Sequence, residues 1–433
     1  MIDRKVLWKP FTANREFNID PKIFVKSDGM YYYTNKGEKI LDAVSGLWCC
    51  NLGNNHAKVV EAIKEQAETM YYNTAFQVGN DLELELANEL VSITPEDLNH
   101  VFFTNSGSES VESALKMALA YHKAVGNGSK TMILGREHSY HGVNFGGISV
   151  GGLINNKRHY NNLLKVAHIP TILDIEKNAF SKGIPEHGAN KAEALLDTIN
   201  IYGAENIAAL IMEPVAGSAG VHVPPKGYLE RISQICKEND ILLIFDEVIT
   251  GFGRLGEAFA STKFGVTPDI MTMAKGLTNG AIPMGAVVAS DKIYDGIVKN
   301  SKTPIEFFHG YTYSGHPIAC AAGIATLKAY KEEKLFEKVA SISSYWQEQL
   351  HTLKGSDKII DIRNLGLVGA IHFSAKNGLA GVRGDKVFKE CYKKGLLVRA
   401  SGDIIALSPA FIVSKDDIQT IVSTLKEVIE NLD

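Results

Sequence analysis

Three short apolar runs, each followed directly by a charged residue, constrain the fold of this chain more than any other feature. The runs are residues 207–212 before Glu213, residues 241–245 before Asp246, and residues 270–274 before Lys275. Short apolar runs bounded by turn residues predict strands that are buried on both faces. A helical pattern over residues 227–237 separates the first two runs, which indicates a parallel sheet. Because ligands of such sheets bind beyond the carboxyl ends of the strands, we expect Glu213, Asp246 and Lys275 to share one edge.

The rest of the chain predicts an α/β fold with a second, smaller α+β domain. The expected elements are helices at about 58–69, 81–93 and 319–330, strands at 100–104, 130–134, 360–363 and 370–373, a hairpin turn at 35–38, a strand pair around 401–403, and a final helix from 416. Residues 1–35 are expected to be irregular. We therefore expect an N-terminal segment (1–55) that joins the small domain, a large domain with the ligand site (56–319), and a C-terminal small domain (320–433).

Charge and composition exclude several classes of function. The chain has 433 residues and a net charge of −4, which argues against a nucleic-acid partner or a polybasic membrane contact. No apolar run approaches the roughly 18 residues of a spanning helix, and the first ten residues lack the apolar core of a secretory signal. The five cysteines show no metal-ligand spacing, and an odd number suits reduced thiols. A cytoplasmic protein with no metal site is expected.

Residues 105–110 (Asn-Ser-Gly-Ser-Glu-Ser) turn a predicted strand into a helix, and they predict an anion site. The unpaired N–H groups and the positive end of the helix dipole would face the ligand, and Gly107 would let the backbone approach closely. Ser106 and Ser108 belong to the same turn. The alternative is an ordinary helix cap by Ser106 or Ser108, and the sequence leaves both open.

Residues 137–142 follow another predicted strand and carry Tyr140 and His141. An aromatic side chain at the carboxyl end of a strand could cover a flat ligand. His138 and His141 have a spacing that metal ligands use, but no acid or cysteine completes a set. We therefore expect structural or ring-positioning roles for these histidines.

Together these features match the requirements of pyridoxal phosphate better than those of free acid–base chemistry. A lysine at a strand end among apolar neighbours loses part of its preference for the charged form, and a neutral amine can form a Schiff base. A nearby aspartate could hold the protonated nitrogen of a pyridine ring. The helix N-terminus would seat the phosphate.

The same residues resemble a known family. Residues 246–254 (Asp-Glu-Val-Ile-Thr-Gly-Phe-Gly-Arg), residues 268–269 and residues 274–276 resemble the signature of class III pyridoxal-phosphate aminotransferases. Residues 105–110, 140–142 and 309–317 match the same family, so the resemblance spans nearly the whole chain. Residues 8–14, 45–48 and 215–221 are most similar to the β-alanine (ω-amino acid)–pyruvate aminotransferases. The resemblance implies the fold type I of pyridoxal-phosphate enzymes, with a mostly parallel seven-stranded sheet.

The resemblance also implies roles for single residues. Lys275 would hold the cofactor covalently and later move a proton, and Asp246 would keep the ring nitrogen protonated. The other cofactor-binding residues implied are Ser106, Gly107, Ser108, Tyr140, His141, Glu213, Val248 and Thr312, the last one supplied by the second subunit of a homodimer. Tyr140 and Val248 would cover the two faces of the ring. Pairing of the dimers into tetramers is left open.

The resemblance implies a substrate pocket lined by Trp48, Phe76 and Arg399. In the ω-amino acid group, the arginine at the position of Arg399 binds a carboxylate and swings aside for substrates that lack one. Arg399 ends the run of residues 395–399, just before a Ser-Gly-Asp turn, where a long side chain could reach into the cleft. The alternative for Arg399 is a surface ion pair.

Four positions depart from the patterns of related enzymes. Ornithine and 4-aminobutyrate enzymes have a glutamate at the position of Ser218 and a glutamine at the position of Ile249, so both departures favour the pyruvate-using group. Ala406 replaces an amide expected in β-alanine enzymes, and Ala75 replaces a phenylalanine of some relatives. These two departures leave the amino donor open, with taurine, 4-aminobutyrate and diamines as alternatives.

The expected function is transfer of an amino group from a β-alanine-like donor or amine to pyruvate, which gives alanine and an aldehyde, ketone or semialdehyde. An aminomutase on the same scaffold is an alternative, and it would need no separate keto acid. A non-catalytic protein with a relic site is disfavoured by the intact lysine, aspartate and phosphate turn. A dinucleotide-binding oxidoreductase is disfavoured because no Gly-x-Gly-x-x-Gly follows an early strand.

Overall fold

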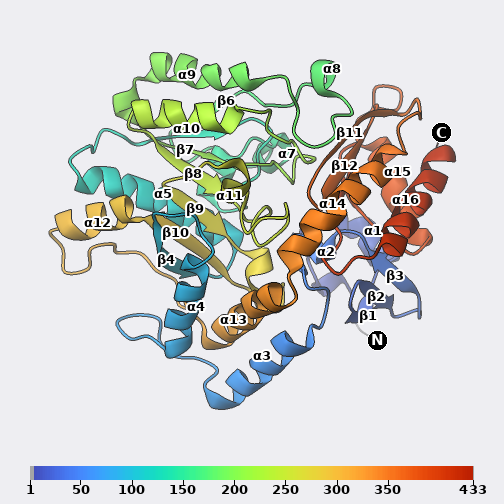
Figure 1. Cartoon of the computed structure of the whole chain (residues 1–433), viewed down its shortest axis with the longest axis horizontal. Helices are drawn as coiled ribbons and strands as arrows, with labels where there is room; N and C mark the ends of the chain where they lie inside the picture. Colours follow the sequence, from blue (N-terminus) through green and yellow to red (C-terminus); the bar gives the residue numbers. More distant parts are fainter. Residues whose placement is uncertain (1–3, 433) are drawn as a thin grey trace.

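The structure is a computed structural model that describes residues 4–432 of the chain. The parts of the N-terminal and C-terminal expectations that fall on residues 1–3 and 433 lie outside the described residues. A large α/β body holds the middle of the chain, and the two ends of the chain lie together beside it (Figure 1).

The large body is built on a seven-stranded sheet with the order β4-β10-β9-β8-β7-β5-β6. The strands are β4 (Leu98–Thr104), β5 (Met132–Arg136), β6 (Val166–Ile169), β7 (Ile207–Met212), β8 (Leu242–Asp246), β9 (Ile270–Met273) and β10 (Gly285–Ser290). Only β10 runs antiparallel to its neighbours. The predicted α/β fold with a mostly parallel seven-stranded sheet is confirmed.

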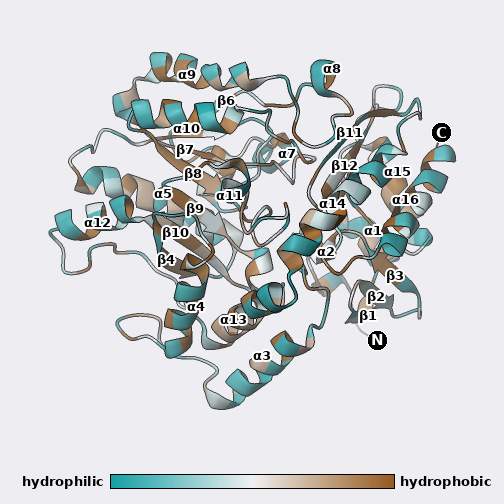
Figure 2. Ribbon diagram, viewed as in Figure 1, coloured by the Kyte–Doolittle hydropathy of each residue, from teal (hydrophilic) through white to brown (hydrophobic). Residues whose placement is uncertain are grey.

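Both faces of this sheet are buried, because alternate residues of each strand point to different layers of helices. In β8, Leu243 and Phe245 pack in one core with α9 (Ala194–Tyr202) and α10 (Tyr228–Glu238). Leu242 and Ile244 pack in the opposite core with α5 (Gly107–Ala124) and α12 (Asp291–Asn300). Figure 2 shows the result, in which apolar strands lie between helices whose outer faces are polar.

The C-terminal part forms a smaller α+β unit. Its antiparallel sheet has the order β11-β12-β15-β14, with β11 (Ile359–Leu365), β12 (Val368–Phe373), β14 (Arg399–Ser401) and β15 (Ile404–Leu407). Its helices are α14 (Leu335–His351), α15 (Val382–Lys393) and α16 (Lys415–Glu430). The N-terminal strands β1 (Phe24–Asp28), β2 (Tyr31–Thr34) and β3 (Lys39–Asp42) make a separate sheet that ends on β13 (Leu396–Leu397), which pairs parallel with β3. The first and last parts of the chain are therefore joined by backbone hydrogen bonds.

The remaining elements connect these layers. They are η1 (Arg4–Val6), α1 (Asn14–Ile19), α2 (Ser45–Trp48), α3 (Ala57–Thr69), α4 (Asp81–Val91), α6 (Phe145–Val150), α7 (Ile154–Lys157), α8 (Ile175–Asn178), η2 (Ala189–Glu193), η3 (Ala204–Asn206), α11 (Ala260–Phe264), η4 (Lys275–Thr278) and α13 (Pro317–Glu332). The predicted helices at 58–69, 81–93 and 319–330 correspond to α3, α4 and α13.

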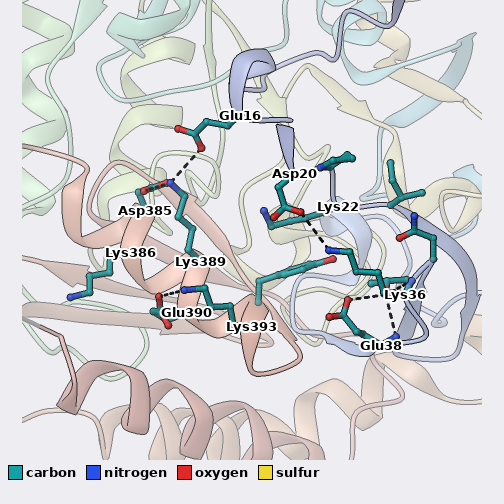
Figure 3. A pocket seen from close by; sticks show the side chains of 15 residues that line it. Glu16, Asp20, Lys22, Lys36, Glu38, Asp385, Lys386, Lys389, Glu390 and Lys393 are labelled. Atoms are coloured by element: carbon teal, nitrogen blue, oxygen red, sulfur yellow. Dashed lines mark hydrogen bonds and ion pairs between the residues drawn. The ribbon is translucent and has the colours of Figure 1, made fainter. Parts of the chain in front are cut away.

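A charged groove of about 480 Å³ lies between the N-terminal segment and α15 (Figure 3). Lys389 pairs with Glu16 at 3.4 Å and with Asp385 at 2.8 Å. Lys36 pairs with Asp20 at 3.5 Å across the N-terminal side of the groove. Of these pairs only Lys389–Glu16 joins α15 to the N-terminal segment, and the acids and lysines along both walls leave no surface of one charge.

One local expectation was wrong. Residues 1–35 were expected to be irregular, but they contain α1 and β1, whose residues are mostly exposed and carry no clear apolar period. The expected strand pair around residues 401–403 is found as β14 and β15, and Arg399 begins β14. Residues 396–397, just before it, pair with β3 in a different sheet. Among the described residues, no helix is long and apolar enough to cross a membrane.

Candidate active site

The predicted meeting of Glu213, Asp246 and Lys275 is found in the structure. Their strands β7, β8 and β9 are adjacent in the sheet. Asp246 ends β8, Glu213 directly follows β7, and Lys275 stands two residues after the end of β9. Glu213 and Asp246 are buried, whereas Lys275 is partly exposed. Burial raises the pKa of Glu213 and lowers the pKa of Lys275, and the negative charge of Asp246 acts on both groups, so the three share one electrostatic environment.

Asp246 is held by two hydrogen bonds. The Nδ1 atom of His141 lies 2.8 Å from Oδ2 of Asp246, and the Val248 N–H donates to Oδ1 at 3.2 Å. The other ring nitrogen of His141, Nε2, is buried without a hydrogen-bond partner among the described residues. These two contacts fix the orientation of the Asp246 carboxylate. An acid that follows a strand and has only a structural role would not need such a fixed orientation.

Glu213 lies beside this pair in a dry environment. Burial, followed in importance by opposing contributions from His141 and Asp246, raises the pKa of Glu213 to about 7. Its Oε2 atom accepts a hydrogen bond from the Tyr140 N–H at 3.3 Å. Glu213 therefore titrates near neutrality and fixes the backbone that carries Tyr140 and His141.

Lys275 begins η4 with a left-handed backbone, at φ +46°. Burial lowers the pKa of its ammonium, while Cys49 and Asp246 oppose that effect. No hydrogen bond or ion pair of its Nζ atom to another described residue is found, and Nζ lies 5.8 Å from the centre of the Trp48 ring. An amine with a lowered pKa and no polar partner is suited to covalent chemistry.

The N-terminus of α5 lies beside Val248. A Cβ atom on Gly107 would come within 3.0 Å of Val248, so only glycine allows this approach. Ser106 caps α5 by accepting from the Glu109 N–H at 3.2 Å, as the alternative interpretation of this turn expected. The cap still leaves the N–H groups of Gly107 and Ser108 without an acceptor in the helix, so the turn remains able to bind an anion.

Gly142 was not singled out by sequence reasoning, yet it is needed at this turn. Its φ is +89°, and a Cβ atom there would lie 2.5 Å from Oγ of Ser108. The next residue, Val143, donates its N–H to the same oxygen at 3.2 Å. The glycine is visible in the Tyr-His-Gly run of the sequence, but the sequence does not show that its backbone has a positive φ angle.

Arg399 and Trp48 lie next to each other, close to Lys275. The guanidinium carbon of Arg399 lies 5.3 Å from the centre of the Trp48 ring, and its Nε atom is buried without a partner. No ion pair of Arg399 with a carboxylate is found among residues 4–432, so the expected alternative of a surface ion pair does not apply. Burial lowers the pKa of Arg399, and the nearby Tyr140 opposes this shift.

Thr312 and Phe76 are not brought to this cluster within one chain. Both are exposed, and they lie near each other because the Tyr72 hydroxyl donates to the Thr312 carbonyl at 3.1 Å and Phe76 packs on Gly310. Tyr311, beside Thr312, is anchored to α5 through Ser113 at 3.1 Å. The Thr312 side chain makes no hydrogen bond to the Ser106–Ser108 turn of its own chain, so it faces outward.

The chain matches the family model described as Aminotransferase class-III over residues 12–429. The chain belongs to the class III aminotransferases. It is 51% identical over 432 residues to a protein of Caulobacter vibrioides named omega-aminotransferase, with 100% of this chain and 98% of that protein covered. It is 45% identical to the omega-amino acid–pyruvate aminotransferase of Pseudomonas putida, over 98% of this chain and 95% of that protein. The solved structure of the omega transaminase of Pseudomonas jessenii in complex with PMP is similar at a TM-score of 0.94 and 31% identity, covering 99% of this chain and 97% of that one.

Class III aminotransferases depend on pyridoxal 5′-phosphate, and the residues of this aminotransferase fit that cofactor. A poorly partnered lysine with a lowered pKa stands beside a buried carboxylate of fixed direction. The glycine-built N-terminus of an 18-residue helix supplies free N–H donors for a phosphate. Among the described residues, no group of three or more His, Cys, Asp or Glu side chains is arranged to hold a metal ion.

Proposed function

We propose that this aminotransferase moves an amino group from an ω-amino acid, such as a β-alanine-like donor, or from an amine to pyruvate. The products would be alanine and an aldehyde, ketone or semialdehyde. The observation that carries this proposal is the free guanidinium of Arg399, which has no carboxylate partner among residues 4–432 and lies over Trp48 near Lys275. The names of the relatives at 51% and 45% identity support the same substrates.

In this proposal Lys275 is the catalytic amine. Bound pyridoxal phosphate supplies an electron-accepting ring, which allows an amino group to leave the substrate carbon. The Nζ atom of Lys275 would bind the cofactor and then carry a proton to and from the substrate. Its lowered pKa favours the neutral amine that both tasks need.

Asp246 would hold a proton on the ring nitrogen of the cofactor. His141 donates to, or shares a proton with, Oδ2 of Asp246, and the Val248 N–H donates to Oδ1, so the carboxylate cannot rotate freely. Tyr140 and Val248 would cover the two faces of the ring. Glu213 would fix the turn that carries Tyr140.

The phosphate would sit at the N-terminus of α5. The N–H groups of Gly107 and Ser108 and the Ser108 hydroxyl would donate to it, while Ser106 keeps the helix capped. Thr312 would complete this seat from a second subunit. Its exposure, together with that of Phe76, supports a homodimer in which each chain contributes to the site of the other.

Arg399, Trp48 and Phe76 would form the substrate pocket. Ser218 offers no carboxylate that could hold the guanidinium, so Arg399 would be free to bind pyruvate and to move aside for an amine. Ala406 lies directly opposite Arg399 in the β14–β15 pair, and its methyl group adds no polar contact. These residues favour a pocket that binds one substrate carboxylate and accepts amino donors of varied structure.

We also propose the domain boundaries 1–55, 56–319 and 320–433 and a cytoplasmic location. Pairing of β3 with β13 supports assigning the N-terminal segment to the small domain. The five cysteines are free, which suits a reducing compartment.

A panel of amino donors tests the proposed reaction. Each donor is mixed with the enzyme and pyruvate, and alanine is measured. We expect alanine to form with β-alanine or with simple amines, and to form only when pyruvate is present. Turnover of the donor without any keto acid would instead support an aminomutase. The Lys275→Ala variant is the control, and it should form no alanine and lack the absorbance of a lysine-bound cofactor.

A further inference from the structure

Arg254 is a fully buried arginine that touches three separate parts of the chain. It follows β8 in the large body, and its Nη1 atom donates to the carbonyl of Pro409 in the C-terminal part at 2.7 Å. Its Nη2 atom donates to Oγ of Ser45 at 3.0 Å and to Oδ1 of Asn51. The guanidinium also lies over the Phe411 ring at 4.6 Å. One side chain therefore ties the large body to the N-terminal segment and to the C-terminal part.

The N-terminal segment held in this way has an unusual backbone. Ser45 and Trp48 both have positive φ angles, +43° and +58°, although neither is glycine. Gly46 between them has φ +71°. Residues other than glycine rarely adopt this backbone conformation, and it persists only where the surrounding structure holds it.

The contacts of Arg254 lie on both sides of Trp48. On one side, the Ser45 hydroxyl donates to the Ser408 carbonyl at 2.9 Å while accepting from Arg254. On the other side, the Asn51 amide donates to the Phe252 carbonyl at 3.2 Å. The strained segment is thus fixed at each end by the same guanidinium.

Trp48 itself has no polar anchor. Its indole Nε1 is buried without a hydrogen-bond partner among the described residues. The position of the ring is therefore set by its packing and by the backbone on either side. That position matters because the ring faces both Lys275, at 5.8 Å, and Arg399, at 5.3 Å.

We propose that Arg254 is a positioning residue. By donating hydrogen bonds to Ser45 and Asn51, it holds Trp48 between Lys275 and Arg399. The inference rests on the proposed function for the role of the pocket, but the placement of Trp48 can be measured without turnover. Arg254 does not touch the reacting atoms in this arrangement. It acts by keeping the indole where the guanidinium of Arg399 can stack on it.

The test uses two substitutions at Ser45, because Arg254→Met removes a buried charge that donates to Ser45, to Asn51 and to the carbonyls of Leu367 and Pro409, and could prevent folding. Ser45→Ala loses the hydroxyl and keeps the strain of a positive φ. Ser45→Gly loses the same hydroxyl and relieves that strain, so it should be the more stable of the two. Thr34→Val is the matched control, since Thr34 is also a buried hydroxyl with several hydrogen bonds but lies on β2 away from the site.

Acrylamide quenching of tryptophan fluorescence reports on Trp48 in the holoenzyme. All variants carry Trp8→Phe, which removes the exposed tryptophan and leaves Trp48 and the core residue Trp346. We expect both Ser45 variants to raise the quenching constant about twofold and the KM for pyruvate about tenfold, with kcat changed less than about twofold. Thr34→Val should match its parent in all three measurements.

The melting temperatures of Ser45→Ala and Ser45→Gly distinguish a role in positioning Trp48 from a merely structural role. Positioning predicts similar losses in the Ala and Gly variants despite their different melting temperatures. Unchanged quenching in both variants would overturn the proposal, as would losses that follow the melting temperature. If quenching rises while the parent enzyme makes no alanine from pyruvate, the proposed substrate is wrong and the positioning of Trp48 by this contact stands.

Discussion

The Nδ1 atom of His141 lies 2.8 Å from Oδ2 of Asp246, and both side chains are buried beside the carboxyl end of β8. The two residues are 105 positions apart in the chain. Their contact joins the turn after β5 to the strand end that carries the predicted cofactor carboxylate. The orientation of the Asp246 carboxylate is therefore set by a residue from another element of the fold. The chemical role of its negative charge can be tested separately from its structural role.

Asp246→Asn should leave a folded protein that binds the cofactor but transaminates slowly, because the ring nitrogen loses its stabilising negative charge. We expect each half-reaction to fall by about 10²–10³, or ~2.7–4 kcal/mol of transition-state stabilisation. Glu247→Gln is the matched control. Glu247 is the neighbouring buried acid, and it accepts from the Ala260 and Ser261 N–H groups instead of facing the site. Near-normal rates in Asp246→Asn would make that aspartate a structural strand-end acid.

Glu213 should make the cofactor-free protein less stable as the pH rises. Burial raises its pKa to about 7 in the folded state, from an ordinary value of 4.5. Between these values the folded state binds more protons than the unfolded state, so the free energy of unfolding falls with pH. The stabilisation is complete below about pH 4.5 and lost above about pH 7, and it amounts to about 3 kcal/mol.

The measurement is the melting temperature of the cofactor-free protein from pH 4.5 to 8, compared with Glu213→Gln. Glutamine keeps an oxygen for the Tyr140 N–H but does not titrate. The difference between the two proteins should change with pH and level off above pH 7. Parallel curves for the two proteins would mean that Glu213 titrates in its ordinary range.

Much of this site was predictable because the information is local. An apolar run that ends on a charge specifies both a buried strand and the edge at which its last side chain stands, so Glu213, Asp246 and Lys275 were placed together correctly. The partners of these residues were less accessible. The His141–Asp246 bond and the position of Arg399 over Trp48 join distant segments, and no periodic pattern specifies which rotamers meet. The run 395–399 is apolar up to Arg399, so its composition does not show that residues 396–397 pair with β3 while Arg399 pairs with β15.

Thr312 should act in the site of the partner subunit. Co-expression of Lys275→Ala with Thr312→Glu tests this, since each homodimer alone is expected to be inactive. In a mixed dimer, the site with an intact Lys275 receives the intact Thr312 from the other chain, so activity should return. Failure of the mixture to gain activity, when mixed dimers are shown to form, would place Thr312 in its own chain's site. Co-expression of Lys275→Ala with Asp246→Asn is the control and should stay inactive, because both residues would belong to the same chain's site.

Lys130 should stabilise the large body without affecting the chemistry. It is 7% exposed, and its ammonium donates to the carbonyls of Ala204 and Asp240, each at 2.8 Å. Two longer contacts reach the carbonyls of Ile207 and Asn239. Lys130→Met removes the donor and leaves these carbonyls without it, so we expect a loss of about 2–4 kcal/mol in the free energy of unfolding. Denaturant titration measures this, and the exposed Lys263→Met should change it by less than about 0.5 kcal/mol.

Arg399 should distinguish substrates that carry a carboxylate next to the reacting carbon from simple amines. Guanidinium matches a carboxylate through two parallel hydrogen bonds, and no carboxylate among the described residues occupies Arg399. Arg399→Ala should therefore weaken the half-reaction with pyruvate or alanine by roughly 10–100-fold, about 1.4–2.8 kcal/mol. The half-reaction with an amine that lacks a carboxylate should fall much less, because the side chain only has to move aside for it.

Stopped-flow measurement of each half-reaction separately decides the role of Arg399. Arg399→Lys is the informative second variant, because it keeps the positive charge and loses the paired geometry. We expect it to recover only part of the pyruvate half-reaction. Equal losses with pyruvate and with the amine would mean that Arg399 supports Trp48 or the cofactor, and full recovery by lysine would mean that charge alone attracts the substrate. A selective loss that lysine repairs only in part would assign the carboxylate to the two parallel N–H groups of Arg399.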